Sequence, residues 1–277
     1  MVQIFYLVFS QLAVGGFALL LLVPKGLIGR GFYRLMGGIY LVAVGCARGA
    51  NLVINGVSFN LGNFLAATQG RDVLFTLVFG YLVLLYLIAL WLKPDTVHRI
   101  LLLLGTIVGF IWIVSSAQPY LEKVQLPAKH ILLPTQFVVS SLLLGAVNTG
   151  MWFGHWYLVT PNLPVVHLKR FNHVYLGALL AAIVFVGGST LFWRQADATN
   201  PFTVFHELIF WLRILLGLGG SAVMYLIIWY CLRDKATQRD AVGATRAATG
   251  FLYIAMITVF TGELCGRLLL LETRLVL

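Results

Sequence analysis

Charged residues are scarce in this chain. Asp, Glu, Lys and Arg make up 10% of its 277 residues, whereas about a quarter is usual in soluble domains. Hydrophobic residues make up 60%, and the mean hydropathy is +0.94. This composition excludes an ordinary soluble globular protein and predicts an integral membrane protein.

Several motifs that would define a function are also absent. The three cysteines stand alone, without the CxxC pairs of many redox and iron–sulfur sites. HExxH, GxSxG, NDxxD and glycine-rich phosphate loops are missing as well. The net charge of +10 comes from Lys and Arg residues scattered singly between apolar runs. Because these residues form no basic stripe, no nucleic-acid partner is expected.

What the chain does contain is a series of apolar runs. About 20 apolar residues are enough to cross a bilayer as a helix. Eight such runs fill most of the sequence, at about 2–23, 32–53, 72–92, 99–117, 134–159, 171–193, 206–232 and 247–271. We therefore predict an all-α integral membrane protein with eight transmembrane helices in a single domain, 1–277, in contact with the lipid bilayer. A short interfacial helix is predicted at 61–67.

The basic residues orient these helices. Eleven Lys and Arg residues lie in or beside the first, third, fifth and seventh connections, and six lie in or beside the other connections and the C-terminal end. Cytoplasmic connections carry the excess of Lys and Arg in membrane proteins. Both termini are therefore predicted to lie outside, in a multi-pass protein of a bacterial inner (plasma) membrane.

Six polar residues fall near the predicted outer ends of three spans. They are Arg48 and Asn51 in the second, His206 and Arg213 in the seventh, and Glu263 and Arg267 in the eighth. A charge at the centre of a bilayer costs about 2.5 to 3.5 kcal/mol or more, so such groups usually pair or mark a site. In one interpretation Glu263 only pairs with an arginine, and Arg267 extends to the interface.

The alternative is a quinone site. Arginines outnumber carboxylates among these residues, and a guanidinium can bind a carbonyl group. Glu263 would accept the proton, Arg48 or Arg213 would donate to the quinone carbonyl, and His206 or Glu207 would lead toward water. Menaquinone and ubiquinone both fit this chemistry.

Two histidines near the predicted cytoplasmic side are candidate ligands of a b-type haem. His155 lies in the fifth run and His173 at the start of the sixth, so they can face each other across an antiparallel helix pair. Gly150 and Gly154 offer small residues where a porphyrin would lie. The neighbouring Trp152 equally fits an alternative, in which this stretch is part of the aromatic belt at the membrane interface.

The last span, GFLYIAMITVFTGELCGRLLL, carries the pattern Gly262, Glu263, Gly266, Arg267. With eight helices and both termini outside, it resembles the membrane anchor subunits of the dimethyl sulfoxide reductase type. The resemblance implies menaquinol binding near the outer face and electron transfer to an iron–sulfur partner, with no catalytic metal in the anchor itself.

The function predicted from the sequence is that of a membrane subunit in a respiratory or photosynthetic electron-transfer complex. It would bind quinone or quinol near the outer face and exchange electrons with an iron–sulfur or c-type cytochrome partner, directly or through b-type haem. It would not be catalytic alone. The alternatives are a secondary transporter of a small anionic substrate and a purely structural membrane anchor.

Overall fold

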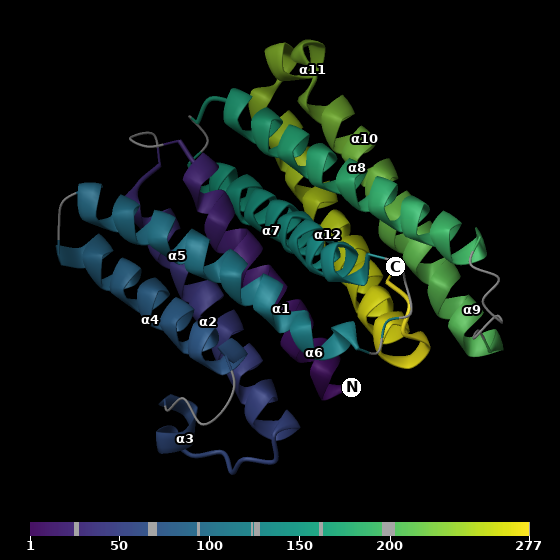
Figure 1. The fold of residues 1–277 in the computed structure, drawn as a ribbon. Helices are drawn as coiled ribbons and strands as arrows, with labels where there is room; N and C mark the ends of the chain where they lie inside the picture. Colours follow the sequence, from purple (N-terminus) through teal and green to yellow (C-terminus); the bar gives the residue numbers. More distant parts are fainter. Residues whose placement is uncertain are drawn as a thin grey trace. The chain divides into compact units, whose positions relative to one another are not determined.

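The computed structural model describes residues 1–24, 28–65, 71–92, 95–122, 124, 128–160, 163–195 and 203–276. In these ranges all regular structure is helical, and no strand occurs (Figure 1). Contacts divide the chain into two compact units. The N-terminal unit comprises Met1–Glu122 and His130–Gly145, and the C-terminal unit comprises Lys123–Lys129 and Ala146–Leu277.

The N-terminal unit is built on four long helices. Its elements are α1 (Val2–Leu19), the 3₁₀ turn η1 (Leu20–Leu22), α2 (Arg30–Ile54), α3 (Leu61–Leu65), α4 (Arg71–Leu92), α5 (Asp95–Ser116), α6 (Gln118–Leu121) and the first half of α7 (Lys129–Val159). Helix α1 packs on α2 and α5, and α4 also contacts both of these helices. A Cβ on Gly15 would lie 1.7 Å from the Ser141 carbonyl oxygen, so glycine is required where α1 meets α7.

The C-terminal unit is organised around its last helix. Its elements after α7 are α8 (Val166–Gln195), α9 (Val204–Trp211), the π-helical η2 (Leu212–Gly220), α10 (Ser221–Leu232), α11 (Asp234–Arg239) and α12 (Ala241–Thr273). Helix α12 contacts α9, η2, α10 and α11, and α8 packs on α10. Asp240 starts α12 by accepting a 2.8 Å hydrogen bond from the Gly243 amide, which satisfies one of the free N–H groups of the first turn.

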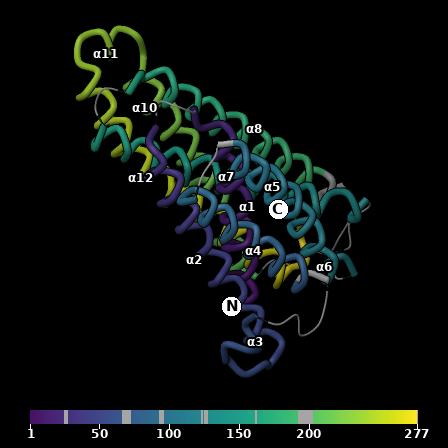
Figure 2. Tube along the Cα trace, turned by 90° about the vertical axis from the view of Figure 1, so that its left-hand side faces the viewer, coloured from purple at the N-terminus to yellow at the C-terminus, as the bar shows by residue number. Residues whose placement is uncertain are grey.

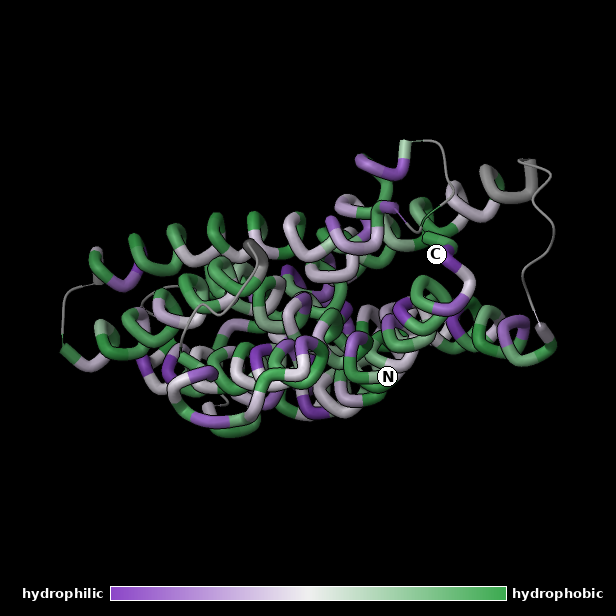
Figure 3. The backbone as a smooth tube through the Cα atoms, turned by 60° about the horizontal axis from the view of Figure 1, so that its bottom comes forward, coloured by the Kyte–Doolittle hydropathy of each residue, from purple (hydrophilic) through white to green (hydrophobic). Residues whose placement is uncertain are grey.

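The predicted fold class is confirmed for the helices. Eight described helical segments are long and apolar enough to cross a membrane, and Figure 3 shows hydrophobic residues, in green, recurring along the helical tubes. Several of these segments begin before the predicted runs. The eighth begins at Ala241 rather than near residue 247, and the fifth begins at Lys129 and continues through Pro134.

The short helix between the second and third spans is also present. Helix α3 covers Leu61–Leu65, close to the end of α2 (Figure 2). Residues 66 and 67 of the predicted segment lie outside the described residues. The prediction of a single domain stays a prediction. The contacts divide the chain into two compact units, and each unit is described by itself.

Candidate functional site

A cavity in the N-terminal unit has an almost wholly apolar lining. Its volume is about 260 Å³, and it is bounded by α2, α3 and α4. Leu41, Val44 and Leu84 are among its apolar walls, and Arg48 and Thr76 contribute polar groups. An apolar cavity with a few placed polar groups is the usual form of a small-molecule site.

Arg48 is held firmly beside this cavity. It is 1% exposed and donates from Nη1 to Asn51 Oδ1 at 3.0 Å, from Nε to the Phe64 carbonyl at 3.1 Å and from Nη2 to the Asn63 carbonyl at 2.7 Å. Asn55 Nδ2 in turn donates to Asn51 Oδ1 at 3.2 Å. The predicted association of Arg48 with Asn51 is therefore present, and two carbonyls of α3 complete it.

In the C-terminal unit the predicted charges form one buried cluster. Glu263 Oε2 lies 3.3 Å from Arg267 Nη2, and its Oε1 lies 3.8 Å from Arg213 Nη1. All three side chains are at most 3% exposed. Arg267 is therefore buried, and the expectation that it extends to the interface is wrong. One carboxylate between two guanidinium groups leaves the cluster with a net positive charge.

Two glycines make this cluster sterically feasible. A Cβ on Gly266 would lie 1.9 Å from Arg213 Nη1, so only glycine leaves room for the guanidinium. A Cβ on Gly262 would lie 2.6 Å from the Gly217 Cα. Because neither residue has a side chain, η2 can pack directly against α12. Arg213 Nη1 then reaches the Gly262 carbonyl at 2.7 Å. The Arg213 side chain thus packs against the stretch of α12 that carries the pattern Gly262, Glu263, Gly266, Arg267.

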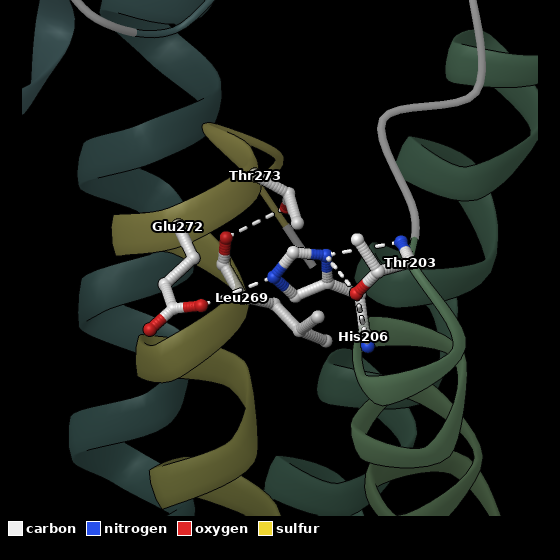
Figure 4. Close-up of polar contacts among 5 residues, drawn as sticks. All are labelled: Thr203, His206, Leu269, Glu272 and Thr273. Carbon is white, nitrogen blue, oxygen red and sulfur yellow. Dashed lines mark hydrogen bonds and ion pairs between the residues drawn. The ribbon is translucent and has the colours of Figure 1, made fainter.

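His206 lies at the start of α9 and contacts the end of α12 (Figure 4). Its Nδ1 accepts from the Thr203 amide at 3.2 Å, and its Nε2 is 3.0 Å from Glu272 Oε2. Because Nδ1 acts as an acceptor, Nε2 carries the proton and donates to the carboxylate. Glu272 is half exposed, so this pair lies at the boundary with solvent. The contact between His206 and Glu272 was not predicted.

The two candidate haem ligands have different neighbours. His155 Nδ1 is 2.8 Å from the Tyr253 hydroxyl of α12, whereas His173 is exposed and lines a cavity with α10. A Cβ on Gly154 would lie 2.8 Å from Thr249 Oγ1, so a side chain of α12 fills the space where a porphyrin was expected. Haem ligation by this pair stays a prediction, and the function proposed below does not use it.

The structure brings together three of the predicted residues in one unit and two in the other. Glu263, Arg213 and Arg267 form the cluster of the C-terminal unit, and Arg48 and Asn51 belong to the N-terminal unit. The predicted convergence of the two groups stays a prediction. The cavity was not predicted, because its walls are ordinary apolar residues without a motif. Comparison with protein-family models, characterised proteins and solved structures found no match for this chain.

Proposed function

We propose that the protein is a membrane subunit of an electron-transfer complex and that it binds quinone or quinol. The observation that carries this proposal is the apolar cavity of the N-terminal unit with the Arg48 guanidinium in its wall. A quinone pairs an apolar ring and tail with two carbonyl oxygens. The cavity offers the same pairing, with hydrocarbon on most of its surface and a cation at one place.

Arg48 is the proposed donor to a quinone carbonyl. Its guanidinium is oriented by Asn51 and by backbone carbonyls of α3, so a ligand would meet a donor whose orientation is already fixed. A preorganised donor binds more tightly because less conformational entropy is lost on binding. The volume of about 260 Å³ is close to the lower end of the about 300–1,000 Å³ that is usual for small-molecule sites, and it suits the ring of the quinone.

Glu263, which lies in the other unit, keeps the role of proton acceptor that the sequence predicts, and its approach to the quinol stays a prediction. Quinol oxidation releases protons, and a carboxylate is a group that can take one. His206 and Glu272 at the boundary with solvent are the proposed exit. In the proposed orientation both termini lie outside in a bacterial inner membrane, and an iron–sulfur or c-type cytochrome partner docks there.

Photoaffinity labelling with an azido-quinone tests the carbonyl donor. In membranes containing the wild-type chain we expect the label on peptides of α2, α3 and α4, with competition by unmodified quinone. Arg48→Gln should reduce labelling about tenfold, which corresponds to loss of about 1.4 kcal/mol. Arg34→Gln is the matched control, because Arg34 lies on the same helix and binds the Leu90 carbonyl at 3.1 Å, outside the cavity.

Two results would count against the proposal. The label could fall on other helices, or Arg48→Gln and Arg34→Gln could retain equal labelling. A structural anchor has one observation in its favour, namely that the Glu263 cluster joins η2 to α12. For such an anchor these variants would change only thermal stability.

A further inference from the structure

A second cavity lies in the C-terminal unit, between the start of α8 and the end of α10. Its volume is about 240 Å³. Lys169, Asn172 and His173 of α8 line one side, and Trp229 of α10 and Arg233 line the other. Unlike the Arg48 cavity, it has a lining shared between polar and apolar groups. Of the residues singled out in the sequence, His173 alone belongs to it, and the proposed quinone site does not use that residue.

The charges around this cavity favour an anion. Lys169 Nζ is paired with Asp234 Oδ1 at 2.5 Å, so these two groups balance. Arg233 remains as a positive charge, and its guanidinium is held 3.7 Å from the centre of the Tyr230 ring. A guanidinium fixed over an aromatic ring keeps its N–H donors available at the ring's edge. The net charge of the lining therefore matches a singly charged anion such as a phosphate diester.

Asn172 places a further demand on the ligand. Its side chain is 4% exposed, and its Oδ1 is buried without a hydrogen-bond partner among the residues that the structure describes. A buried acceptor without a partner is unfavourable, so a donor brought by a ligand would stabilise this position. A ligand that carries a hydroxyl or ammonium group beside its anion would supply that donor.

The apolar side of the cavity continues along the surface of α10. Trp229 is 50% exposed, and Leu226, one turn before Tyr230, is 58% exposed. These side chains lie on a helix that is long and apolar enough to cross a membrane, so they offer a hydrocarbon surface next to the polar cavity. A ligand that extended from the cavity along α10 would need an acyl chain.

The geometry points to a phospholipid site at this cavity. The phosphate diester lies between Lys169 and Arg233, a headgroup hydroxyl donates to Asn172 Oδ1, and an acyl chain follows Trp229 along α10. Phosphatidylglycerol has all three parts. Basic pockets between transmembrane helices are a recognised form of lipid headgroup site. This inference is independent of the quinone proposal, because the two cavities share no residue.

Native mass spectrometry of the delipidated full-length protein in detergent tests the site. Titration with dioctanoyl phosphatidylglycerol should show one saturable site. The double variant Lys169→Gln with Arg233→Gln should weaken this binding about tenfold or more. The charge-matched control is Lys235→Gln with Arg239→Gln on α11, which changes two exposed basic residues that do not line the cavity and should bind as the wild type does.

Further probes identify the source of the anion. Dioctanoylglycerol, which has the same chains without phosphate, and inorganic phosphate should both bind at least tenfold more weakly. Inorganic phosphate that displaces the lipid at equal concentration would overturn a lipid ligand. Equal lipid binding by the two double variants would overturn the site itself.

Asn172→Leu provides a variant that keeps every charge. It removes the buried acceptor and should weaken phosphatidylglycerol binding while circular dichroism shows an unchanged helix content. Unchanged binding in Asn172→Leu would contradict the role assigned to Asn172. Arg48→Gln should leave lipid binding intact, so failure of the quinone proposal and failure of this one are distinguishable.

Discussion

At the scale of single residues, the buried carboxylate of Glu263 is important for stability because it lies between two buried arginines. It lies between Arg267, one turn along the same helix, and Arg213 of η2. Removing one member of a buried ion-pair network leaves the other charges without compensation, which costs about 3–5 kcal/mol. Glu263 therefore stabilises the contact between η2 and α12, whatever its part in proton transfer.

Replacing Glu263 with Gln separates these two roles. We expect Glu263→Gln to abolish quinol-dependent electron transfer, measured per assembled complex, because the amide cannot accept the proton. The same change should lower the free energy of unfolding by about 3 kcal/mol, so activity is compared at a temperature at which the variant remains folded.

Glu272→Gln is the control for this measurement. Glu272 is 48% exposed in its pair with His206, and the side-chain oxygen of Gln can still accept the hydrogen bond from Nε2. Its replacement should leave stability nearly unchanged and slow proton release at most moderately. Normal turnover of folded Glu263→Gln protein would contradict the role of Glu263 as proton acceptor and favour the structural anchor.

The sequence predicted the local polar pairs because helix periodicity determines them. Glu263 and Arg267 are four residues apart, and Arg48 and Asn51 are three apart, so each pair shares a helix face. Contacts with other segments were harder to predict. The carbonyls of α3 that bind Arg48 are backbone groups, and a sequence does not mark which carbonyl will be nearby. The partnership of His155 with Tyr253 likewise depends on how two distant helices pack.

At the scale of elements, the contact between η2 and α12 depends on a pair of facing glycines. The Cβ that an alanine would add at Gly262 lies 2.6 Å from the Gly217 Cα. Small residues allow such close approach of membrane helices. The π-helical turns of η2 occur in the same place, over Leu212–Gly220. Close packing and the wider helical turn together bring the base of the Arg213 side chain to α12.

Gly262→Ala should therefore destabilise the protein. Overpacking against a backbone atom costs about 1–3 kcal/mol, because neither helix can move without disturbing the Arg213 contact. Thermal unfolding in detergent, followed by circular dichroism, should show a lower midpoint.

A second glycine provides the comparison for this variant. Gly187 is also in the middle of a long helix, but nothing lies within 4 Å of a Cβ added there. Gly187→Ala should raise stability by up to about 1 kcal/mol through helix propensity. An equal response of the two variants would show that facing glycines do not control this contact.

The helix limits show what hydropathy alone omits. The predicted sixth run began at residue 171, but α8 begins at Val166 and includes Lys169 and Arg170. Lys and Arg are good helix formers, so a helix continues past its apolar part. The start of α12 depends on the Asp240 cap, a local hydrogen bond that an apolar window does not include.

At the scale of the whole molecule, the sequence predicted the eight helices that are long and apolar enough to cross a membrane, because length and apolar content are properties of each segment alone. The division into two units was not predicted. Its limit at Gly145 and Ala146 falls inside the continuous helix α7, where no loop or change of composition marks it. The cavities could not be predicted either, because their walls come from several helices, and the proposed functions depend on these cavities.

The orientation of the spans is the remaining property of the whole chain, and it decides on which side a partner docks. Positively charged connections stay in the cytoplasm, so α11 should face the cytoplasm, and the connection after α2 should face outward.

After replacement of all three cysteines, a single cysteine is introduced by Lys235→Cys or by Ser58→Cys, both at exposed positions. A membrane-impermeant maleimide applied to intact spheroplasts should label the Ser58→Cys chain and should label the Lys235→Cys chain only after lysis. A permeant maleimide should label both, which controls for reactivity. The reverse pattern would place both termini in the cytoplasm, and a partner that meets the ends of α2 and α12 would then have to be cytoplasmic.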